Sequence, residues 1–278
     1  MGADNNDHST NHTLNPNFKI EIIPGPALLD PARRSLLHNL NDLLNDAYAT
    51  SKAATTVPNN TSQSLFSKSR IRTEDQLVQE LGTTGLIAIC TDTSLPEFAR
   101  DTQQWSINLT RGYSPGKYGN VVATAALAPW KGGVVENFLR ALAVTKQQQG
   151  EATDIVAVAD VHAKVFDYSS NPSEATSDWE VKTCASCDDP RYRGKGLITH
   201  CIDALIKSFL AELRKSDDGR SHVSATPIKL WLSTREGYNS QYWTRRGFVT
   251  ERVDVAPVGV WGSIEEFRIV TLTKTIRR

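Results

Sequence analysis

The chain has 278 residues, which is enough for one large domain or two small ones. Its 31 basic and 31 acidic side chains cancel, so no overall basic field predicts nucleic acid or an anionic membrane as a partner. A hydrophobic fraction of 39% allows a substantial core, but no run of about 18 apolar residues predicts a transmembrane helix.

The N-terminal segment is polar throughout. Residues 1–17 lack the apolar stretch of a signal peptide, and the four cysteines of the chain suit a reducing compartment. We therefore predict a cytoplasmic protein, with the nucleus left open. The same residues 1–17 are predicted to be a disordered tail that can be deleted with little change in melting temperature, ahead of a single domain over 18–278.

The first elements of the domain are a strand and a helix. Phe18–Ile23 alternates in polarity like a strand, and Asp30-Pro31 places a capping residue before a proline at the first helical position. An apolar stripe at helical spacing follows. Its members are Leu29, Ala32, Leu36, Leu40, Leu43, Leu44 and Ala47.

A short helix and two strands come next. Thr73 and Gln76 have the spacing of a capping box, and Gly82 is a glycine stop for the helix that it would begin. Leu86–Cys90 and Val121–Leu127 have the apolar, β-branched composition of buried strands.

Residues 129–178 are predicted to be an insertion between two strands of the sheet. Val134–Lys146 has a helical pattern, and Ile155–Val165 reads as an extra strand. Ser169–Asp178 has the composition of a loop.

The last hundred residues have the clearest pattern. A strand ends near Ser186, and a helix with one apolar face begins at Leu197. That face consists of Leu197, Cys201, Ile202, Leu205, Phe209 and Leu213. The elements predicted after it are the strand Ile228–Leu232, the helix Tyr238–Arg246 and a closing hairpin of Val249–Val255 and Phe267–Lys274.

A glycine-rich turn connects that strand to that helix. It reads Arg191-Tyr192-Arg193-Gly194-Lys195-Gly196. A strand, a glycine-rich turn and a helix point backbone N–H groups at an anion, and the helix dipole favours negative charge there. The turn lacks the third glycine of a dinucleotide fingerprint and the GxxxxGK[ST] of a nucleoside-triphosphate loop. It is nevertheless suited to a pyrophosphate.

The turn matches R/Q-x-x-G-x-G and resembles motif A of the GNAT superfamily, the acyl-CoA-dependent N-acetyltransferases. Downstream, Tyr242-Trp243-Thr244-Arg245-Arg246-Gly247-Phe248 resembles motif B of that superfamily. The resemblance is strong over 179–273 and weak over 18–128. It implies an α/β (α+β) fold with a mixed, mostly antiparallel central sheet flanked by helices, and an insertion before the CoA-binding strand.

The resemblance also implies where acetyl-CoA would bind. The turn would hold the pyrophosphate through its backbone, the preceding strand would pair with pantetheine, and one asparagine would bond the pantetheine arm. The residues concerned are Cys184, Ala185, Ser186, Arg191, Tyr192, Arg193, Gly194, Lys195, Gly196, Leu197 and Asn239. The strand N–H groups would also face the thioester oxygen.

Two residues are candidates for proton transfer. Glu180 lies thirteen residues before Arg193. The resemblance to the histone-acetyltransferase branch of the GNAT superfamily implies a general base at this spacing. The alternative for Glu180 is an ion pair with Lys182 at the strand end. Tyr242 is the candidate acid toward the departing thiolate, and its alternative is a packed aromatic beside CoA.

Several weaker candidates remain. Tyr238 is a second candidate acid, and His162 is a base if the insertion reaches the site. Cys184 and Cys187 lie on or beside a strand without a second CxxC, so we predict core thiols and no metal site.

The sequence thus predicts an acetyl-CoA-dependent N-acetyltransferase that transfers the acetyl group directly to a primary amine in a ternary complex. The amine could belong to a small molecule, a protein lysine or a protein N-terminus, and the chain to a monomer or a homodimer. The alternative is a non-catalytic acyl-CoA-binding or sensing module.

Overall fold

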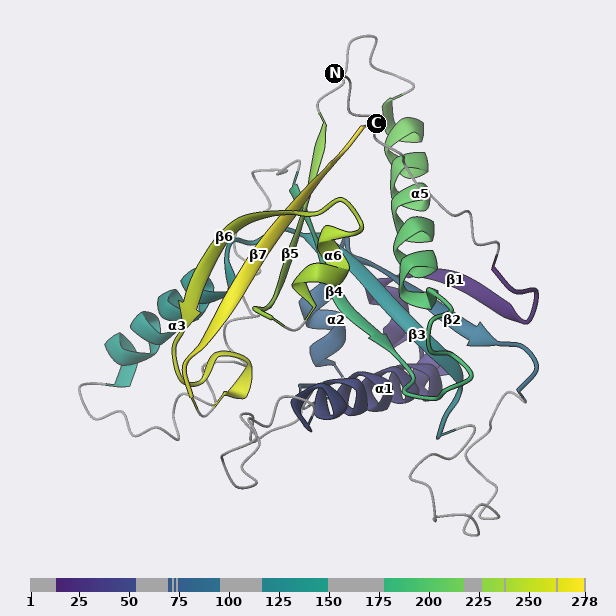
Figure 1. Ribbon diagram of the computed structural model, residues 1–278, viewed down its shortest axis with the longest axis horizontal. Helices are drawn as coiled ribbons and strands as arrows, with labels where there is room; N and C mark the ends of the chain where they lie inside the picture. Colours follow the sequence, from purple (N-terminus) through teal and green to yellow (C-terminus); the bar gives the residue numbers. More distant parts are fainter. Residues whose placement is uncertain are drawn as a thin grey trace, which may run out of the picture.

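The computed structural model describes residues 14–53, 70–71, 73, 75–95, 117–149, 178–217, 227–237, 239–263 and 265–277. Within them, seven strands form one sheet in the order β1-β2-β3-β4-β5-β7-β6 (Figure 1). The strands are β1 (Phe18–Pro24), β2 (Leu86–Asp92), β3 (Lys117–Pro129), β4 (Asp178–Ser186), β5 (Ile228–Arg235), β6 (Val249–Ala256) and β7 (Phe267–Ile276). All neighbouring strands are antiparallel except β4 and β5, which are parallel. The predicted mixed, mostly antiparallel sheet is confirmed.

Helices flank this sheet. They are α1 (Arg34–Ala53), α2 (Gln76–Leu81), α3 (Val134–Gln149), α5 (Leu197–Asp217) and α6 (Ser240–Thr244). Adjacent residues of a strand point to opposite faces. On β4, the Trp179 ring packs on Phe209 of α5. The next residue, Glu180, interacts electrostatically with Glu80 of α2. The helices α2 and α5 therefore cover opposite faces. None of the described helices is both long and apolar enough to span a membrane.

The apolar stripe of α1 is buried only in part as predicted. Leu40, Leu43 and Leu44 are at most 1% exposed, but Leu29 is 53% exposed and Ala32 is also exposed. Residues 25–33 form two short 3-10 turns, so α-helical periodicity begins only at Arg34. Leu37, absent from the predicted stripe, is buried instead.

The predicted capping box of α2 is wrong, although the helix itself is present. The Gln76 side chain donates to the Arg70 carbonyl at 3.2 Å and to Glu80 Oε1 at 3.0 Å instead of capping the helix. Asp75 is the N-cap residue. The helix ends as predicted at Gly82, whose φ is +66°.

The segment between β3 and β4 leaves the sheet between two neighbouring strands. Pro129 at the end of β3 pairs directly with Trp179 of β4. The first part of the connection is α3, whose Phe138 packs in a small second core with Phe267 and Ile269. The strand predicted over 155–165 lies outside the described residues.

Residues 14–17 contact the rest of the described chain. Leu14 packs against the main core, and the Asn17 carbonyl accepts a hydrogen bond from the Thr93 amide at 2.7 Å. The predicted tail therefore includes residues that contact the domain. Residues 1–13 lie outside the described part of the chain.

Candidate active site

The sheet splits between β4 and β5. The strands pair only over Asp178–Glu180 and Lys229–Trp231, although β4 continues to Ser186 and β5 to Arg235. Figure 1 shows them diverging, with α6 between them. We call this divergence the β4/β5 split. Among the described residues, the β5-facing edge of 181–186 has no strand partner. An extended molecule with amide groups could hydrogen-bond along that edge.

A β-bulge interrupts β4 inside the split. Ala126 of β3 faces Lys182, whereas Thr124 faces Ala185, so two residues of β4 stand opposite one residue of β3. The first of these two is Thr183, whose φ is +48°. Its buried hydroxyl has no hydrogen-bond partner in the described part of the chain.

The bulge changes which side chains share a face. Because Thr124 and Ala126 lie on one face of β3, their partners Ala185 and Lys182 lie on one face of β4. Ser186 then points to the opposite face. Uninterrupted alternation would have placed Glu180, Lys182, Cys184 and Ser186 on one face, but the extra residue shifts the alternation by one.

Two aspartates shape the turn that follows β4. Asp189 accepts the Arg191 amide at 2.7 Å and the Arg191 guanidinium at 2.8 and 2.9 Å. Asp188 accepts the Arg193 guanidinium at 2.6 and 3.0 Å. Both arginine charges are thus compensated within the turn. Lys195 is exposed and has no ion-pair partner among the described residues.

The turn leaves backbone donors at the start of α5. Among the described residues, the amides of Gly194, Gly196 and Leu197 have no backbone partner. Both glycines have a positive φ, of +71° and +66°, and a Cβ at either would meet no atom within 4 Å. Open space beside both glycines therefore accompanies amides without a backbone partner at a helix N-terminus. This geometry fits a phosphate group.

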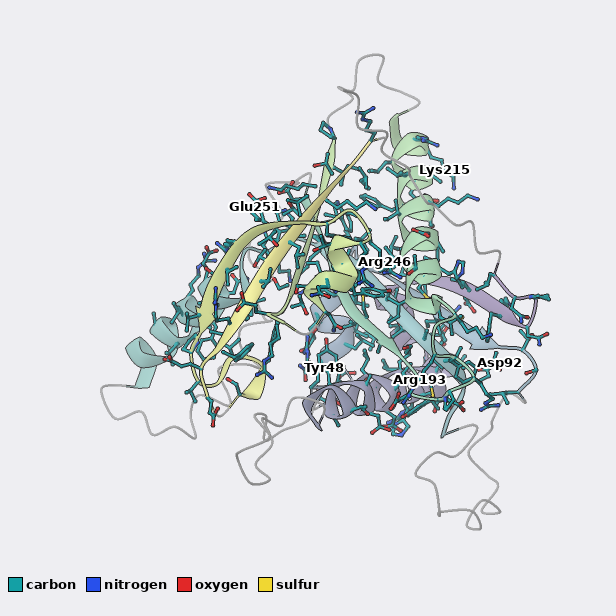
Figure 2. All side chains as sticks on the ribbon, viewed as in Figure 1. Tyr48, Asp92, Arg193, Lys215, Arg246 and Glu251 are labelled. Atoms are coloured by element: carbon teal, nitrogen blue, oxygen red, sulfur yellow. The ribbon has the colours of Figure 1, made fainter. Side chains whose placement is uncertain are left out.

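Tyr192 anchors the turn to the sheet. Its side chain is buried, and its hydroxyl donates to Asp92 Oδ2 at 3.0 Å at the end of β2. Figure 2 shows Asp92 in the same region as Arg193. Burial and the hydrogen bond to Asp92 raise the pKa of Tyr192 well above its usual range. The Tyr192 amide donates to the Asp189 carbonyl at 2.9 Å, so neither the hydroxyl nor the amide of Tyr192 is available to a ligand in this structure.

Glu180 lies at the closed end of the β4/β5 split, where it is the last residue of β4 paired with β5. Its side chain is buried and forms an ion pair with Lys182 Nζ at 3.0 Å. Burial raises the pKa of Glu180, and the Lys182 charge opposes the rise. A raised carboxyl pKa suits a general base near neutral pH. The alternative of a strand-end ion pair is equally compatible with this contact.

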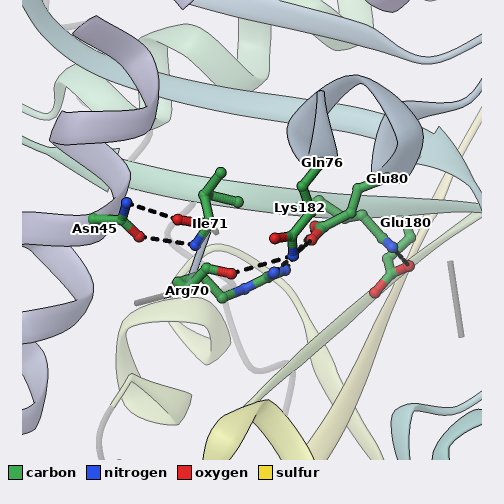
Figure 3. Close-up of polar contacts among 7 residues, drawn as sticks. All are labelled: Asn45, Arg70, Ile71, Gln76, Glu80, Glu180 and Lys182. Carbon is green, nitrogen blue, oxygen red and sulfur yellow. Dashed lines mark hydrogen bonds and ion pairs between the residues drawn. The ribbon is translucent and has the colours of Figure 1, made fainter. Parts of the chain in front are cut away.

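A buried charge cluster adjoins Glu180, and the sequence analysis missed it (Figure 3). Glu80 accepts two hydrogen bonds from Arg70, one of them at 2.6 Å, and its side chain is 0% exposed. Burial acts to raise the pKa of Glu80, but Arg70, Lys182 and the Gln76 hydrogen bond together lower it. We call Arg70, Glu80, Glu180 and Lys182 the closed-end cluster.

Neighbouring contacts hold this cluster in place. Asn45 of α1 brackets the backbone of Ile71, accepting from its amide at 2.8 Å and donating to its carbonyl at 3.0 Å (Figure 3). The Arg70 guanidinium lies 5.7 Å from the centre of the Tyr48 ring. Burial raises the pKa of Tyr48. The one sequence signal for Glu80 is its position next to apolar residues of α2 that are buried.

Tyr242 of α6 contacts the first turn of α5. Its hydroxyl lies 3.2 Å from Thr199 Oγ1, and the Arg246 guanidinium lies 3.5 Å from the centre of its ring. Burial raises the pKa of Tyr242, whereas the Thr199 hydrogen bond and the Arg246 charge lower it. Cys184 also acts electrostatically on Tyr242, which links this side chain to β4 inside the split.

The aromatic residues Trp243 and Phe248 of motif B pack against each other. Trp243 is buried and packs edge-on against Phe248, with ring centres 5.6 Å apart. The helix α6 is shorter than the predicted Tyr238–Arg246, and Asn239 is its exposed N-cap without a side-chain capping bond. The candidates Tyr238 and His162 lie outside the described residues.

The cysteines behave as core thiols. Cys90, Cys187 and Cys201 are buried, and Cys184 is partly buried with a pKa raised to about 12 by burial. All four are free of disulfides. In the described part of the chain, no group of three or more metal-binding side chains occurs.

No protein-family model and no curated protein matches this sequence. Solved structures do. NAA60 of Arabidopsis thaliana, in complex with a bisubstrate analogue, is 13% identical with a TM-score of 0.43, covering 93% of this chain and 99% of that one. The ribosomal-protein-S18-alanine N-acetyltransferase of Escherichia coli is 13% identical with a TM-score of 0.40, covering 94% and 96%.

An acyl-CoA N-acyltransferase of Pseudomonas aeruginosa is 11% identical with a TM-score of 0.38, covering 92% of this chain and 99% of that one. N-acetyltransferases are thus among the solved structures to which this chain is similar. The ligand that this chain could bind is therefore inferred from the β4/β5 split, the glycine turn and the side chains around them.

Proposed function

We propose that this chain is an acetyl-CoA-dependent N-acetyltransferase that transfers the acetyl group directly to a primary amine. The observation that supports this most is the path of β4. After Glu180, β4 separates from β5, passes a bulge and leads into the glycine turn that begins α5. One strand therefore joins a candidate base, a free backbone edge and an anion site.

The donor would lie along that strand. The free amides of Gly194, Gly196 and Leu197 would hold the pyrophosphate, with Lys195 adding charge. The amide-containing pantetheine arm would pair with the free edge of 181–186, and Asn239 would bond it from α6. The thioester would then lie toward the closed end of the split, where the β4 amides would polarise its carbonyl.

The chemistry removes two protons from the acceptor nitrogen and adds one to the departing sulfur. Glu180 would take the first proton from the acceptor ammonium, directly or through water, and the free amine would attack the carbonyl carbon. As the C–N bond forms, the C–S bond breaks, its electron pair stays on sulfur, and the nitrogen loses its second proton to solvent. Tyr242 would donate a proton to that sulfur, giving CoA thiol and an amide.

A non-catalytic acyl-CoA sensor would use the same turn and split. It would not need Glu180 or Tyr242 at the two sides of the split. Thiol release from acetyl-CoA across a panel of amines, including a polyamine, an amino acid and a lysine peptide, separates the two. Turnover with any amine supports the enzyme, and binding without turnover across the panel supports the sensor.

Gly196→Asp tests the anion site. It would place a carboxylate where the pyrophosphate is proposed to lie, so we expect CoA binding to be lost, as measured by calorimetry. The matched control is Gly82→Asp, because Gly82 has the same φ of +66° and equally open surroundings at the end of α2. Both substitutions place a side chain at a positive φ, so both variants should lose some stability. CoA affinity that is retained in folded Gly196→Asp would refute the assignment.

A further inference from the structure

We infer that Thr199 and Arg246 are positioning residues that turn the Tyr242 hydroxyl proton away from α5 and toward the β4/β5 split. The inference rests on the proposed acetyl transfer, because Tyr242 is the proton donor in that reaction. Neither residue was a candidate in the sequence. Arg246 bridges α6 and α5 (Figure 2).

The hydrogen bonds around Thr199 determine the direction of the Tyr242 proton. Thr199 Oγ1 accepts from Arg246 Nε at 2.8 Å and from Arg246 Nη2 at 2.6 Å. A hydroxyl oxygen has two acceptor lone pairs, and these two N–H groups use both. The contact of 3.2 Å between Thr199 and Tyr242 must then be a hydrogen bond that Thr199 donates. Tyr242 accepts it, and its own proton remains available to another partner.

Arg246 is itself held in a fixed orientation. Its third nitrogen, Nη1, donates to the Tyr242 carbonyl at 3.2 Å, and its own carbonyl accepts from Lys274 Nζ at 2.8 Å. The guanidinium thus contacts Tyr242 through the ring and the backbone as well as through Thr199. A bidentate, preorganised guanidinium loses little freedom on forming these bonds.

The same contacts favour loss of the Tyr242 proton. A hydrogen bond donated to the phenol oxygen and a cation over the ring both stabilise a phenolate more than a phenol. The charged or titratable groups that act on Tyr242 are Arg246 from the end of α6, Asp203 from α5 and Cys184 from β4. Arg246 opposes burial, whereas Asp203 and Cys184 act in the same direction as burial.

In the proposed step, the C–S bond breaks, the sulfur keeps the electron pair, and the Tyr242 O–H proton forms the S–H bond. The phenolate that results is stabilised by Thr199 and Arg246 until it regains a proton from solvent. Thr199 keeps its own proton throughout. Its role is to orient and stabilise, so we call it positioning rather than catalytic.

The test is the titration of Tyr242, followed by NMR in protein with ¹³Cζ-labelled tyrosine and without acetyl-CoA. Tyr242→Phe identifies the Tyr242 signal among the seven tyrosines. We expect the pKa of Tyr242 to shift upward in Thr199→Val and in Arg246→Gln, and to return toward wild type in Thr199→Ser. The control is Arg245→Gln, which removes an exposed positive charge one residue earlier and should cause little change.

An unchanged Tyr242 pKa in folded Thr199→Val would overturn the inference, whatever the activity. With a confirmed acceptor, we also expect Thr199→Val to lower kcat about tenfold without raising KM for acetyl-CoA, because it loses one hydrogen bond to a developing charge. A rise in KM alone would instead assign Thr199 to donor binding and refute the positioning role. A pKa shift without turnover on any amine would uphold the geometry and refute the proposed function.

Discussion

The closed-end cluster and the glycine turn lie at opposite ends of one strand, and they use charge in opposite ways. In the cluster, the side chains of Arg70, Glu80, Glu180 and Lys182 are 0–15% exposed. In the turn, the Arg193 and Asp188 side chains are 65% and 48% exposed, whereas Asp189, which pairs with Arg191, is 6% exposed. Removing one partner of a buried ion pair is costly, whereas an exposed pair contributes little. Side-chain identity should therefore dominate at the closed end, and backbone shape should dominate at the turn.

Glu180→Gln should have the largest effect on activity. It keeps the shape of the side chain but removes its basicity, so we expect kcat to fall about 10²–10⁴-fold while CoA affinity holds. The loss should shrink at high pH, where more of the acceptor is free amine. Steady-state rates against pH with one confirmed acceptor measure this. Wild-type kcat across the range would exclude the base and leave only the ion pair.

Lys182→Gln distinguishes the two interpretations of Glu180. Lys182 opposes the effect of burial, so its removal should raise the pKa of Glu180 further. A base must be deprotonated to act, and activity is lost as pH falls through its pKa. The acidic limb of the pH–rate profile should then move to higher pH in Lys182→Gln. If Glu180→Gln and Lys182→Gln both lose stability but keep the wild-type pH–rate profile, the Glu180–Lys182 ion pair is structural.

Glu80→Gln should have the largest effect on stability. It leaves the buried Arg70 guanidinium without its anionic partner, and we expect a loss of about 3–5 kcal/mol in the free energy of unfolding. Denaturant titration measures this loss. The control is Glu212→Gln, because Glu212 pairs with Lys215 on the surface of α5 and should cost little. Similar losses in both variants would contradict the contrast between buried and exposed pairs.

The pH dependence of stability sharpens the same prediction. The pKa of Glu80 is lowered from 4.5 in the folded state. Its contribution is therefore present in full above pH 4.5 or so, and it is lost as pH falls through the lower, folded-state value. Wild type should lose stability more steeply than Glu80→Gln in that acidic window. Parallel curves would show that the Glu80 charge does not stabilise the fold.

The elements that the sequence predicted correctly are those with local signals. The strands and α5 have strong apolar periodicity, and the turn has glycines that its positive φ values require at Gly194 and Gly196. The bulge at Thr183 has no such signal, since no glycine or proline marks it. A single extra residue there changes the face to which the following side chains of β4 point.

The site residues that the sequence missed depend on distant contacts. Arg70 and Glu80 adjoin Glu180, although about a hundred residues separate them in the chain. Thr199 and Arg246 meet across two helices. Nothing local distinguishes such residues from surface charges, because only the folded sheet brings them together.

The smallest effect is expected at the turn, where the contrast with the closed end can be tested most directly. Arg193 is paired with Asp188 and is 65% exposed, so its charge is compensated before any ligand arrives. Arg193→Gln should weaken CoA binding by no more than a few-fold, consistent with the small contribution of exposed ion pairs. Lys195→Gln, which removes the exposed charge that has no ion-pair partner in the described chain, should weaken binding more, and its effect should diminish as salt screens the charge. Calorimetric CoA affinities for both variants at low and high salt measure this. A loss in Arg193→Gln as large as that in Gly196→Asp would mean that the turn holds its anion through side chains, and the proposed difference between the two ends of β4 would be wrong.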